Sequence, residues 1–215
     1  MDFVWDQREV ILGGFRTTVW LAVTAGVLST VIGTLLAIMR VGPIPPLRWA
    51  GATYVILVRN IPLTLVFVFS TFGLPRMEIR LSFVAFAIIA LTVYHSAFVC
   101  EAVRSGINAV DAGEIEAARS IGLPFRRTLS LVVLPQAFRA VIPPLGNVYN
   151  ALLKNTSVAV AFSVAEASSI FRRLSNDDAS ATWPLLLTTA VGYILLASLV
   201  FLGVRFLERR SAVSR

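Results

Sequence analysis

The sequence has little charge, and it contains one cysteine, one histidine and one lysine among 215 residues. Charged residues make up 14% of the chain, against roughly 25% in soluble domains, so a soluble fold would have little polar surface to present to water. With Cys100 as the single cysteine, no disulfide and no thiolate metal site forms within one chain. With His95 as the single histidine, nothing indicates a metal site, and a hydrogen-bonded packing role is the favoured interpretation.

The lysine content excludes ATP binding through a phosphate-binding loop. Such a loop needs Gly-Lys followed by Ser or Thr, whereas Lys154 lies between Leu153 and Asn155. The net charge of +7 would suggest a nucleic-acid partner in a soluble protein. Here the basic residues flank apolar segments, so their placement indicates membrane topology instead.

Long uncharged runs are what the sequence does contain. Residues 17–39 form a run of 23, residues 81–100 a run of 20 and residues 179–204 a run of 26, and the mean hydropathy is +0.79. A helix needs about 20 apolar residues to cross a bilayer. The chain is therefore predicted to be an all-α integral membrane protein. The first run is longer than the apolar core of a cleaved signal peptide. Acidic residues also precede it, where a signal peptide has positive charge.

Two less regular segments raise the number of predicted spans to five. One of them, about 49–73, contains an Arg-Asn-Ile-Pro sequence ending at Pro62, which we expect to interrupt the helix at membrane depth. The other, about 137–162, contains Pro143 and Pro144, which we also expect to break a helix. The predicted spans are about 11–39, 49–73, 81–107, 137–162 and 183–207, in a membrane domain at 11–208 between an external segment at 1–10 and a cytoplasmic tail at 209–215.

Short hydrophilic segments are predicted to join these spans. Loops are expected at 74–80 and around 172–178, and a longer non-membrane stretch at 108–130. Eleven arginines fall on the side of the membrane that holds this stretch, and six fall on the other side. Because basic residues favour the cytoplasmic side, the N-terminus is predicted outside and the C-terminus in the cytoplasm.

The stretch at 108–130 is predicted to contain a short helix. Asp111 and Glu114 have the spacing of a capping box, in which each side chain satisfies a backbone N–H of the first helical turn. Gly122 and Pro124 are expected to end this helix, because glycine allows the chain to reverse and proline cannot continue the helix.

Residues 116–135 contain a spaced motif: Glu-Ala-Ala, three residues, Gly122, nine residues, Val132, one residue, and Leu-Pro. The motif resembles the EAA signature of ABC importer permeases, with Val132 where the signature has Ile. A bare Glu-Ala-Ala is common in helices, but matched spacing across 20 residues between the third and fourth predicted spans is specific. The candidate residues for coupling to an ATPase are Glu116, Ala117, Ala118, Gly122, Leu134 and Pro135.

Further segments resemble the polar amino acid branch of these permeases, the glutamate, glutamine and histidine type. They lie at 59–62, at 101–107 leading to 113–118, and at 154–157, and the resemblance covers about 14–208. It implies a type I ABC importer core of five transmembrane helices with a cytoplasmic coupling helix, in a bacterial cell membrane. It also implies a second permease subunit, two ATPase subunits that bind ATP and Mg, and an external solute-binding protein. This chain would be a transport subunit without a bound cofactor, not an enzyme.

Ionisable side chains inside predicted spans are energetically costly, which makes them candidates for a translocation path. Arg59 and Lys154 could contact a substrate carboxylate or a gate; alternatively, they and Glu101 form structural ion pairs. The balance of charge leans towards glutamate or glutamine, while cystine and other polar amino acids remain open. The candidate path residues are Arg59, Asn60, Tyr94, His95, Glu101, Asn150 and Lys154.

Two other classes of protein compete with the importer hypothesis. A carrier driven by an ion gradient would need its own coupling site, often two or three interior carboxylates, whereas only Glu101 and Glu166 lie near a predicted span. A scaffold or channel subunit is disfavoured by the interrupted helices and the charges within them. The sequence leaves open which amino acid is carried and whether the second permease is an identical copy.

Overall fold

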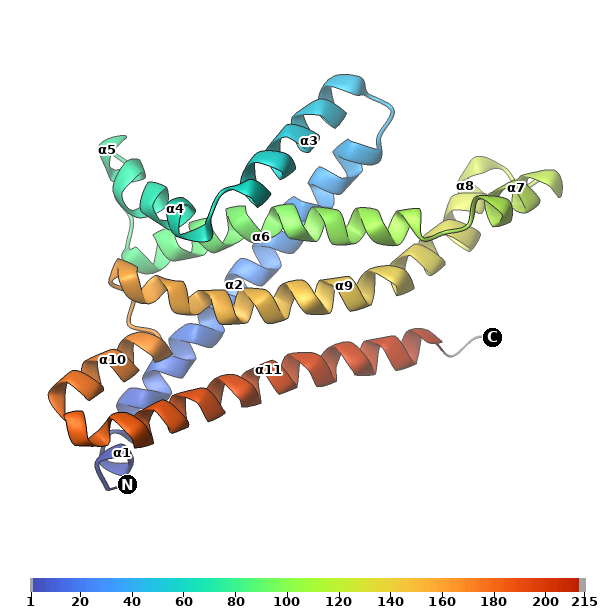
Figure 1. The fold of residues 1–215 in the computed structure, drawn as a ribbon. Coiled ribbons are helices and arrows are strands. Elements are labelled where there is room, and N and C mark those ends of the chain that lie inside the picture. The colour runs from blue at the N-terminus through green and yellow to red at the C-terminus, as the bar shows by residue number, and fades with distance from the viewer. Residues whose placement is uncertain (1, 213–215) are drawn as a thin grey trace.

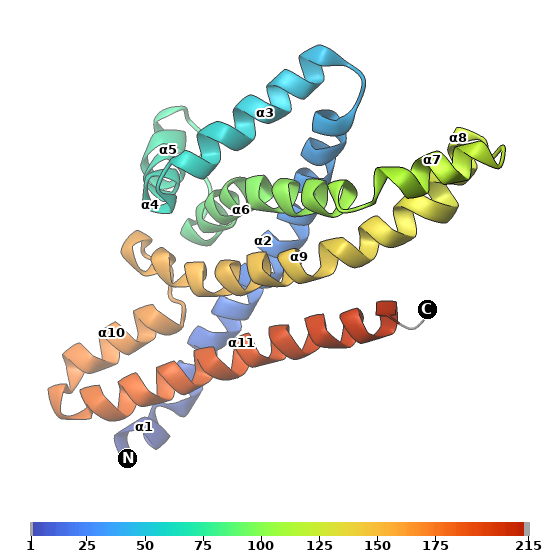
Figure 2. The same cartoon turned by 45° about the vertical axis from the view of Figure 1, so that its right-hand side comes forward.

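The computed structural model describes residues 2–212 as a bundle of helices without strands in that range. Its four longest helices are α2, Arg8–Val41, α6, Phe83–Asn108, α9, Leu134–Asn155, and α11, Thr182–Ala212. The helices α6, α9 and α11 run side by side, and α2 crosses them diagonally (Figures 1 and 2).

Shorter helices complete the bundle. A helix of 16 residues, α3, folds back from the end of α2, and α10 leads into α11. The remaining segments are short turns of helix that extend or connect the longer ones. The bounds are α1, Asp2–Asp6, α3, Pro45–Asn60, α4, Leu63–Val68, α5, Leu74–Arg76, α7, Ala112–Ser120, α8, Phe125–Thr128, and α10, Ala167–Asp177, with π-helical turns at Phe69–Gly73 and Leu129–Val133 and 3-10 turns at Thr156–Phe162 and Ala179–Ala181.

The number of candidate membrane-spanning helices is four or five, which is compatible with the prediction of five. Four helical segments are long and apolar enough to cross a bilayer, at Arg8–Val41, Phe83–Asn108, Phe125–Phe162 and Ala179–Arg210. A fifth arises if Pro45–Asn60 and Leu63–Arg76, which are bent by 105°, count together as one broken span. The predicted all-α membrane fold is confirmed, with four candidate spans, or five if the bent pair is one span.

The break in this fifth span lies where proline predicts it. Helix α3 ends at Asn60, and Ile61 takes an extended conformation, φ −95° and ψ 133°. The residue before a proline is pushed out of the helical region by the proline ring. Pro62 then starts α4 in a new direction, so the expected interruption is confirmed.

The expected break at Pro143 and Pro144 is wrong, because both prolines lie inside the continuous helix α9. The φ that a proline ring imposes is compatible with a helix, although the missing N–H and the clash of the ring with the carbonyl four residues earlier both carry a penalty. Tight packing against α6 supports this helix, since a Cβ on Gly106 would lie 2.1 Å from the Val141 side chain. Helix α9 changes character later, at Thr156, where 3-10 geometry begins.

The two predicted loops are also partly helical. Leu74–Arg76 forms α5, and the segment expected as a loop around 172–178 belongs mostly to α10. Helix α10 is amphipathic, with Ile170 and Leu174 buried one turn apart. Its charged residues occupy the outer face, which is why the sequence suggested a loop.

The core lies where α2, α4, α6 and α9 meet. Phe67 of α4 is fully buried and stacks on Phe162, with ring centroids 5.0 Å apart. Leu21, Leu91 and Leu152 fill the space around this pair. Small residues bring the backbones of α2 and α6 together, as such residues do in membrane proteins.

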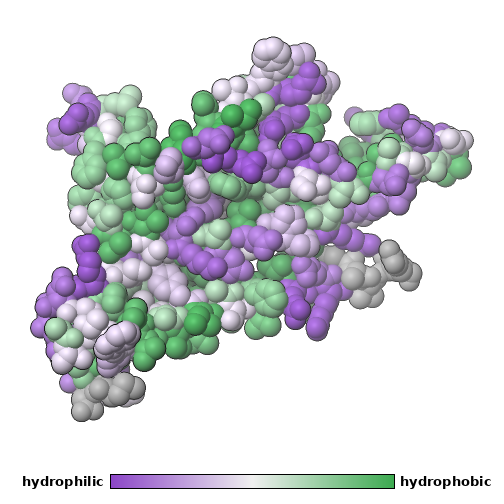
Figure 3. Space-filling model, in the orientation of Figure 1, coloured by the Kyte–Doolittle hydropathy of each residue, from purple (hydrophilic) through white to green (hydrophobic). Residues whose placement is uncertain are grey.

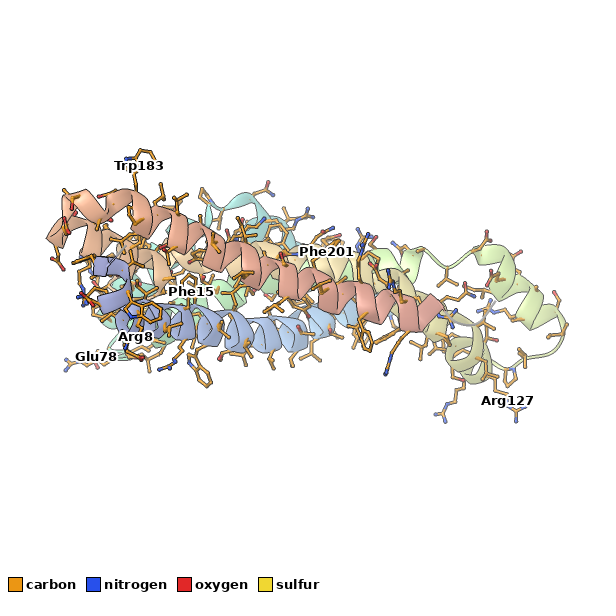
Figure 4. The ribbon with its side chains drawn as sticks, turned by 90° about the horizontal axis from the view of Figure 1, so that it is seen from below. Arg8, Phe15, Glu78, Arg127, Trp183 and Phe201 are labelled. Atoms are coloured by element: carbon orange, nitrogen blue, oxygen red, sulfur yellow. The ribbon has the colours of Figure 1, made fainter. Side chains whose placement is uncertain are left out.

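Helix α11 is the least enclosed of the long helices, with 6% of its apolar window buried. Trp183 at its start projects away from the neighbouring helices and is 73% exposed (Figure 4). On its inner side, Tyr193 meets the edge of the Phe15 ring of α2, with centroids 5.9 Å apart. The rest of the bundle therefore holds α11 along one narrow side.

Candidate functional site

Helix α7 forms at the predicted place between α6 and α9, which correspond to the third and fourth predicted spans. The Asp111 carboxylate accepts a hydrogen bond from the Gly113 backbone N–H at 2.7 Å, which caps the helix. After Ser120 the chain reverses at Gly122, whose φ is +82°. Glycine adopts this left-handed conformation without the strain that a side chain would bring.

The candidate coupling residues differ in exposure. Glu116 and Ala117 lie on the exposed side of α7, whereas Ala118 is buried. Leu134 and Pro135 are exposed at the start of α9. Glu116 and Ala117 therefore present a small, acidic outer surface at one end of the molecule, where hydrophilic and hydrophobic residues are mixed (Figure 3).

A hydrogen bond between two side chains joins α7 to α9. The Glu114 carboxylate accepts a hydrogen bond from the Gln136 side-chain amide, so it does not complete the capping box that the sequence predicted. Gln136 was not among the candidate residues. Its partner lies 22 positions earlier in the chain, a separation that no local sequence pattern reports.

Glu101 lies at the centre of a charge cluster formed by three helices. It pairs with Arg40 of α2, with Arg104 of α6 at 2.9 Å and with Arg59 of α3 at 3.8 Å. The ion pair between Arg59 and Glu101, one of the two alternatives that the sequence left open, is therefore present. Arg40 was missed because its partner lies 61 positions away, and Lys154 does not belong to this cluster.

His95 is buried and hydrogen-bonded, as expected for a packing residue. Its Nδ1 lies 2.9 Å from the Leu91 carbonyl oxygen, and its Nε2 lies 3.2 Å from the Asn155 side-chain nitrogen. His95, Tyr94 and Asn155 line a pocket of about 280 Å³ between α6 and α9. The ring of Phe98 closes one side of this pocket.

A larger open groove of about 690 Å³ lies between α9 and α11. Asn147, Asn150 and Lys154 recur every three or four residues along α9 and so share one face of the helix. Ser198 of α11 faces them across the groove. A hydrophilic band runs across the middle of the molecule near α9 (Figure 3).

Lys154 is exposed in this groove. Among residues 3–210, no carboxylate lies within ion-pair distance of its ammonium group. The Asn150 side-chain oxygen, buried beside the groove, makes no hydrogen bond within the described part of the chain. Asn155 and Asn147 line both the groove and the smaller pocket, so the two spaces adjoin.

Asn60 does not join these residues. Its side chain donates a 2.7 Å hydrogen bond to the Ile56 carbonyl one turn back, on the exposed side of α3. The described site thus has two parts, the groove on α9 with its pocket, and the Glu101 cluster. Arg59 connects them, because its guanidinium lies over the Phe98 ring, 5.4 Å from the centroid.

Glu166 forms a further polar cluster at the opposite end of the bundle from α7. Its carboxylate is fully buried, and it accepts hydrogen bonds from the Ser168 and Ser169 backbone N–H groups and from the Tyr193 hydroxyl. Burial raises the pKa of Glu166 above its ordinary value, although these hydrogen bonds oppose that shift. Glu166 caps α10 and ties it to α11.

Comparison with known proteins gives consistent results. Residues 29–213 match the family described as binding-protein-dependent transport system inner membrane component. The chain is 36% identical over 211 residues to the probable glutamine ABC transporter permease protein GlnM of Bacillus subtilis, covering 98% of this chain and 97% of that protein. It is 38% identical over 228 residues to the glutamate transport system permease protein GluC of Corynebacterium efficiens, covering 100% of both. A crystal structure of an amino acid ABC transporter with histidines has the same fold, with a TM-score of 0.89 at 24% identity over 96% of each chain.

Proposed function

Because the chain belongs to the family of binding-protein-dependent transport system inner membrane components, we propose that it forms the translocation path for a polar amino acid. Glutamate and glutamine are the favoured substrates, since relatives named for these two amino acids align with nearly the whole chain. The chain is a transport subunit and not an enzyme. Membership of this family disfavours both a carrier driven by an ion gradient and a passive scaffold.

The groove on α9 is the observation that carries the assignment of the path. An amino acid zwitterion needs a cation for its carboxylate and neutral acceptors for its ammonium group. Lys154 supplies the cation, and the side chains of Asn147, Asn150 and Ser198, which line the same groove, supply neutral acceptors. Asn147 and Asn155 extend this polar surface into the adjoining pocket.

The outer side of α7 is the proposed contact with the ATPase. Alanine favours a helix and adds little bulk, so a partner subunit can approach Ala117 closely. Glu116 beside it offers a negative charge to a basic partner residue. ATP and Mg would bind to two ATPase subunits, and a second permease and an external solute-binding protein would complete the transporter. In this arrangement, α7 and the C-terminus face the cytoplasm and the N-terminus lies outside.

Uptake by membrane vesicles that contain the whole transporter tests this function. Wild-type vesicles are expected to take up glutamate or glutamine only when ATP is supplied inside. Lys154→Gln is expected to lower glutamate uptake more than glutamine uptake, because the extra carboxylate of glutamate depends more on a cation. Lys154→Arg, which keeps the charge, is expected to retain most uptake of both.

Arg80→Gln is the matched control, since it removes one exposed positive charge that does not line the groove. ATP-independent uptake would contradict the importer assignment. Unchanged glutamate uptake in Lys154→Gln would contradict the proposed path and leave the family assignment in place.

A further inference from the structure

The Glu101 cluster carries more positive than negative charge. Three guanidinium groups, from Arg40, Arg59 and Arg104, face the single carboxylate of Glu101. Arginine stays protonated in proteins, so the cluster keeps an excess of two positive charges. Within residues 3–210, no other carboxylate lies at ion-pair distance from these three arginines.

The three arginines are not equally engaged. The Arg40 side chain is 15% exposed and also approaches the Cys100 sulfur, so it is a largely enclosed partner of Glu101. The Arg104 and Arg59 side chains are 37% and 45% exposed. Arg59 lies 3.8 Å from the Glu101 carboxylate, beyond hydrogen-bonding distance, so its N–H donors remain available.

Position connects the cluster to the proposed path. The Arg59 guanidinium lies over the ring of Phe98, and the same ring lines the pocket that His95 and Asn147 share. A molecule in this pocket is therefore one side chain away from Arg59. Glu101 and Arg104 belong to the last turns of α6, the end that leads to α7, so the cluster lies between the pocket and the α7 end of the bundle.

Unbalanced charge within a membrane-spanning segment is unfavourable unless a counter-charge reaches it. Guanidinium groups bind carboxylates with paired, charge-assisted hydrogen bonds. We propose that Arg59 and Arg104 form a second carboxylate-binding station, which receives the transported amino acid after it leaves Lys154 and before release. The proposal rests on the importer function above. Glu101 has the role of a positioning residue that holds both arginines while leaving them net positive.

Equilibrium binding of radiolabelled glutamate tests the station apart from transport. The sample is the complete transporter in lipid nanodiscs, without binding protein and without ATP. Lys154→Gln removes the first station, and this variant is expected to retain measurable glutamate binding. Adding Arg59→Gln is expected to weaken the remaining binding by about tenfold, the scale of one lost charge-assisted hydrogen bond. In the same Lys154→Gln background, Arg80→Gln is expected to leave glutamate binding unchanged.

Equal glutamate binding by Lys154→Gln and by the double variant with Arg59→Gln would overturn the proposal. Loss of all binding in Lys154→Gln itself would also overturn it. If the Arg59→Gln protein fails to assemble, Arg104→Gln in the same background replaces it, with the same expected weakening. ATP-driven uptake by the wild-type transporter is measured in parallel, so failure of the station is distinguishable from failure of the importer function.

Discussion

The Gln136 amide of α9 donates a hydrogen bond to the Glu114 carboxylate of α7, which joins the candidate coupling helix to the helix that carries the groove. Lys154 and Asn150 lie on the same continuous helix as Gln136. A displacement of α7 would therefore be passed towards the groove along one continuous helix. Loss of this hydrogen bond should lower the amount of amino acid transported per ATP hydrolysed, while ATP hydrolysis itself continues.

Gln136→Ala is expected to lower the amount of amino acid transported per ATP hydrolysed by about fivefold, the factor that a loss of ~1 kcal/mol represents. ATP hydrolysis by the transporter is expected to change little, because Gln136 belongs to α9 and not to α7. The measurement is uptake and phosphate release in the same proteoliposomes.

Exchanging the two side chains is the matched control. Glu114→Gln combined with Gln136→Glu keeps one carboxylate and one amide in contact, so the double variant is expected to recover most of the lost coupling. A Gln136→Ala protein with the wild-type ratio of transport to hydrolysis would show that the link is dispensable.

Gly122→Val is expected to destabilise the turn after α7 by about 1–2 kcal/mol, because the left-handed conformation is strained for a residue with a side chain. A Cβ at Gly122 would meet nothing within 4 Å, so the effect comes from the backbone and not from a clash. Gly122→Asn is expected to be milder, since asparagine tolerates this conformation better. Hydrogen exchange of the α7 backbone measures the effect; equal exchange in both variants would contradict it.

Gly106→Ala is expected to lower stability by about 1–3 kcal/mol through overpacking between α6 and α9. The added Cβ would lie 2.1 Å from the Val141 side chain and 2.9 Å from the Ala137 carbonyl oxygen. Thermal unfolding in detergent provides the measurement. Gly13→Ala is the control, since a Cβ there would have nothing within 4 Å; if the two alanine variants unfold alike, the close approach of α6 and α9 is refuted.

Glu166→Gln is expected to remove a pH-dependent contribution to stability. Because burial raises the pKa of Glu166 above its ordinary value of 4.5, the folded protein holds this proton more tightly than the unfolded chain. The stabilisation is complete below that ordinary value and is lost as the pH rises through the raised one. The melting temperature of the wild-type protein, relative to the Gln variant, should therefore fall as the pH increases above 4.5.

Melting curves over a series of pH values measure this difference directly. Asp177→Asn, on the exposed side of the same helix α10, controls for the removal of one negative charge. A difference between the wild-type and Glu166→Gln proteins that is constant or rises with pH would contradict the predicted effect of burial.

Hydropathy and helix-ending residues made the helices of this chain predictable. Uncharged runs located α2, α6 and α11, and the Arg-Asn-Ile-Pro sequence located the break at Pro62, because each signal is local. The break predicted at Pro143 and Pro144 was wrong, because packing between α9 and α6 decides whether that helix continues. The loop predicted around 172–178 was also wrong. Most residues of α10 are polar or charged, and only a few residues on its buried side show the helical pattern.

Only those parts of the candidate site that depend on neighbouring residues in the sequence were predictable. The turn at Gly122 and the cap at Asp111 depend on neighbouring residues, whereas Arg40 and Gln136 meet partners from other helices. Glu166 was noted as a carboxylate near a span, but its burial and its bond to Tyr193 depend on how α10 packs against α11. Contacts of this kind appear only once the helices are placed.

Because α11 contacts its own subunit along one narrow side, most of its surface remains available to lipid or to another protein. Substitutions on that outer surface are therefore expected to leave the packing of the bundle intact. The inner residues of α11, including Tyr193 and Gly192, have no such freedom, because Phe15 packs directly against both. Packing of the bundle therefore constrains the inner side of α11, and the outer side can vary without disturbing that packing.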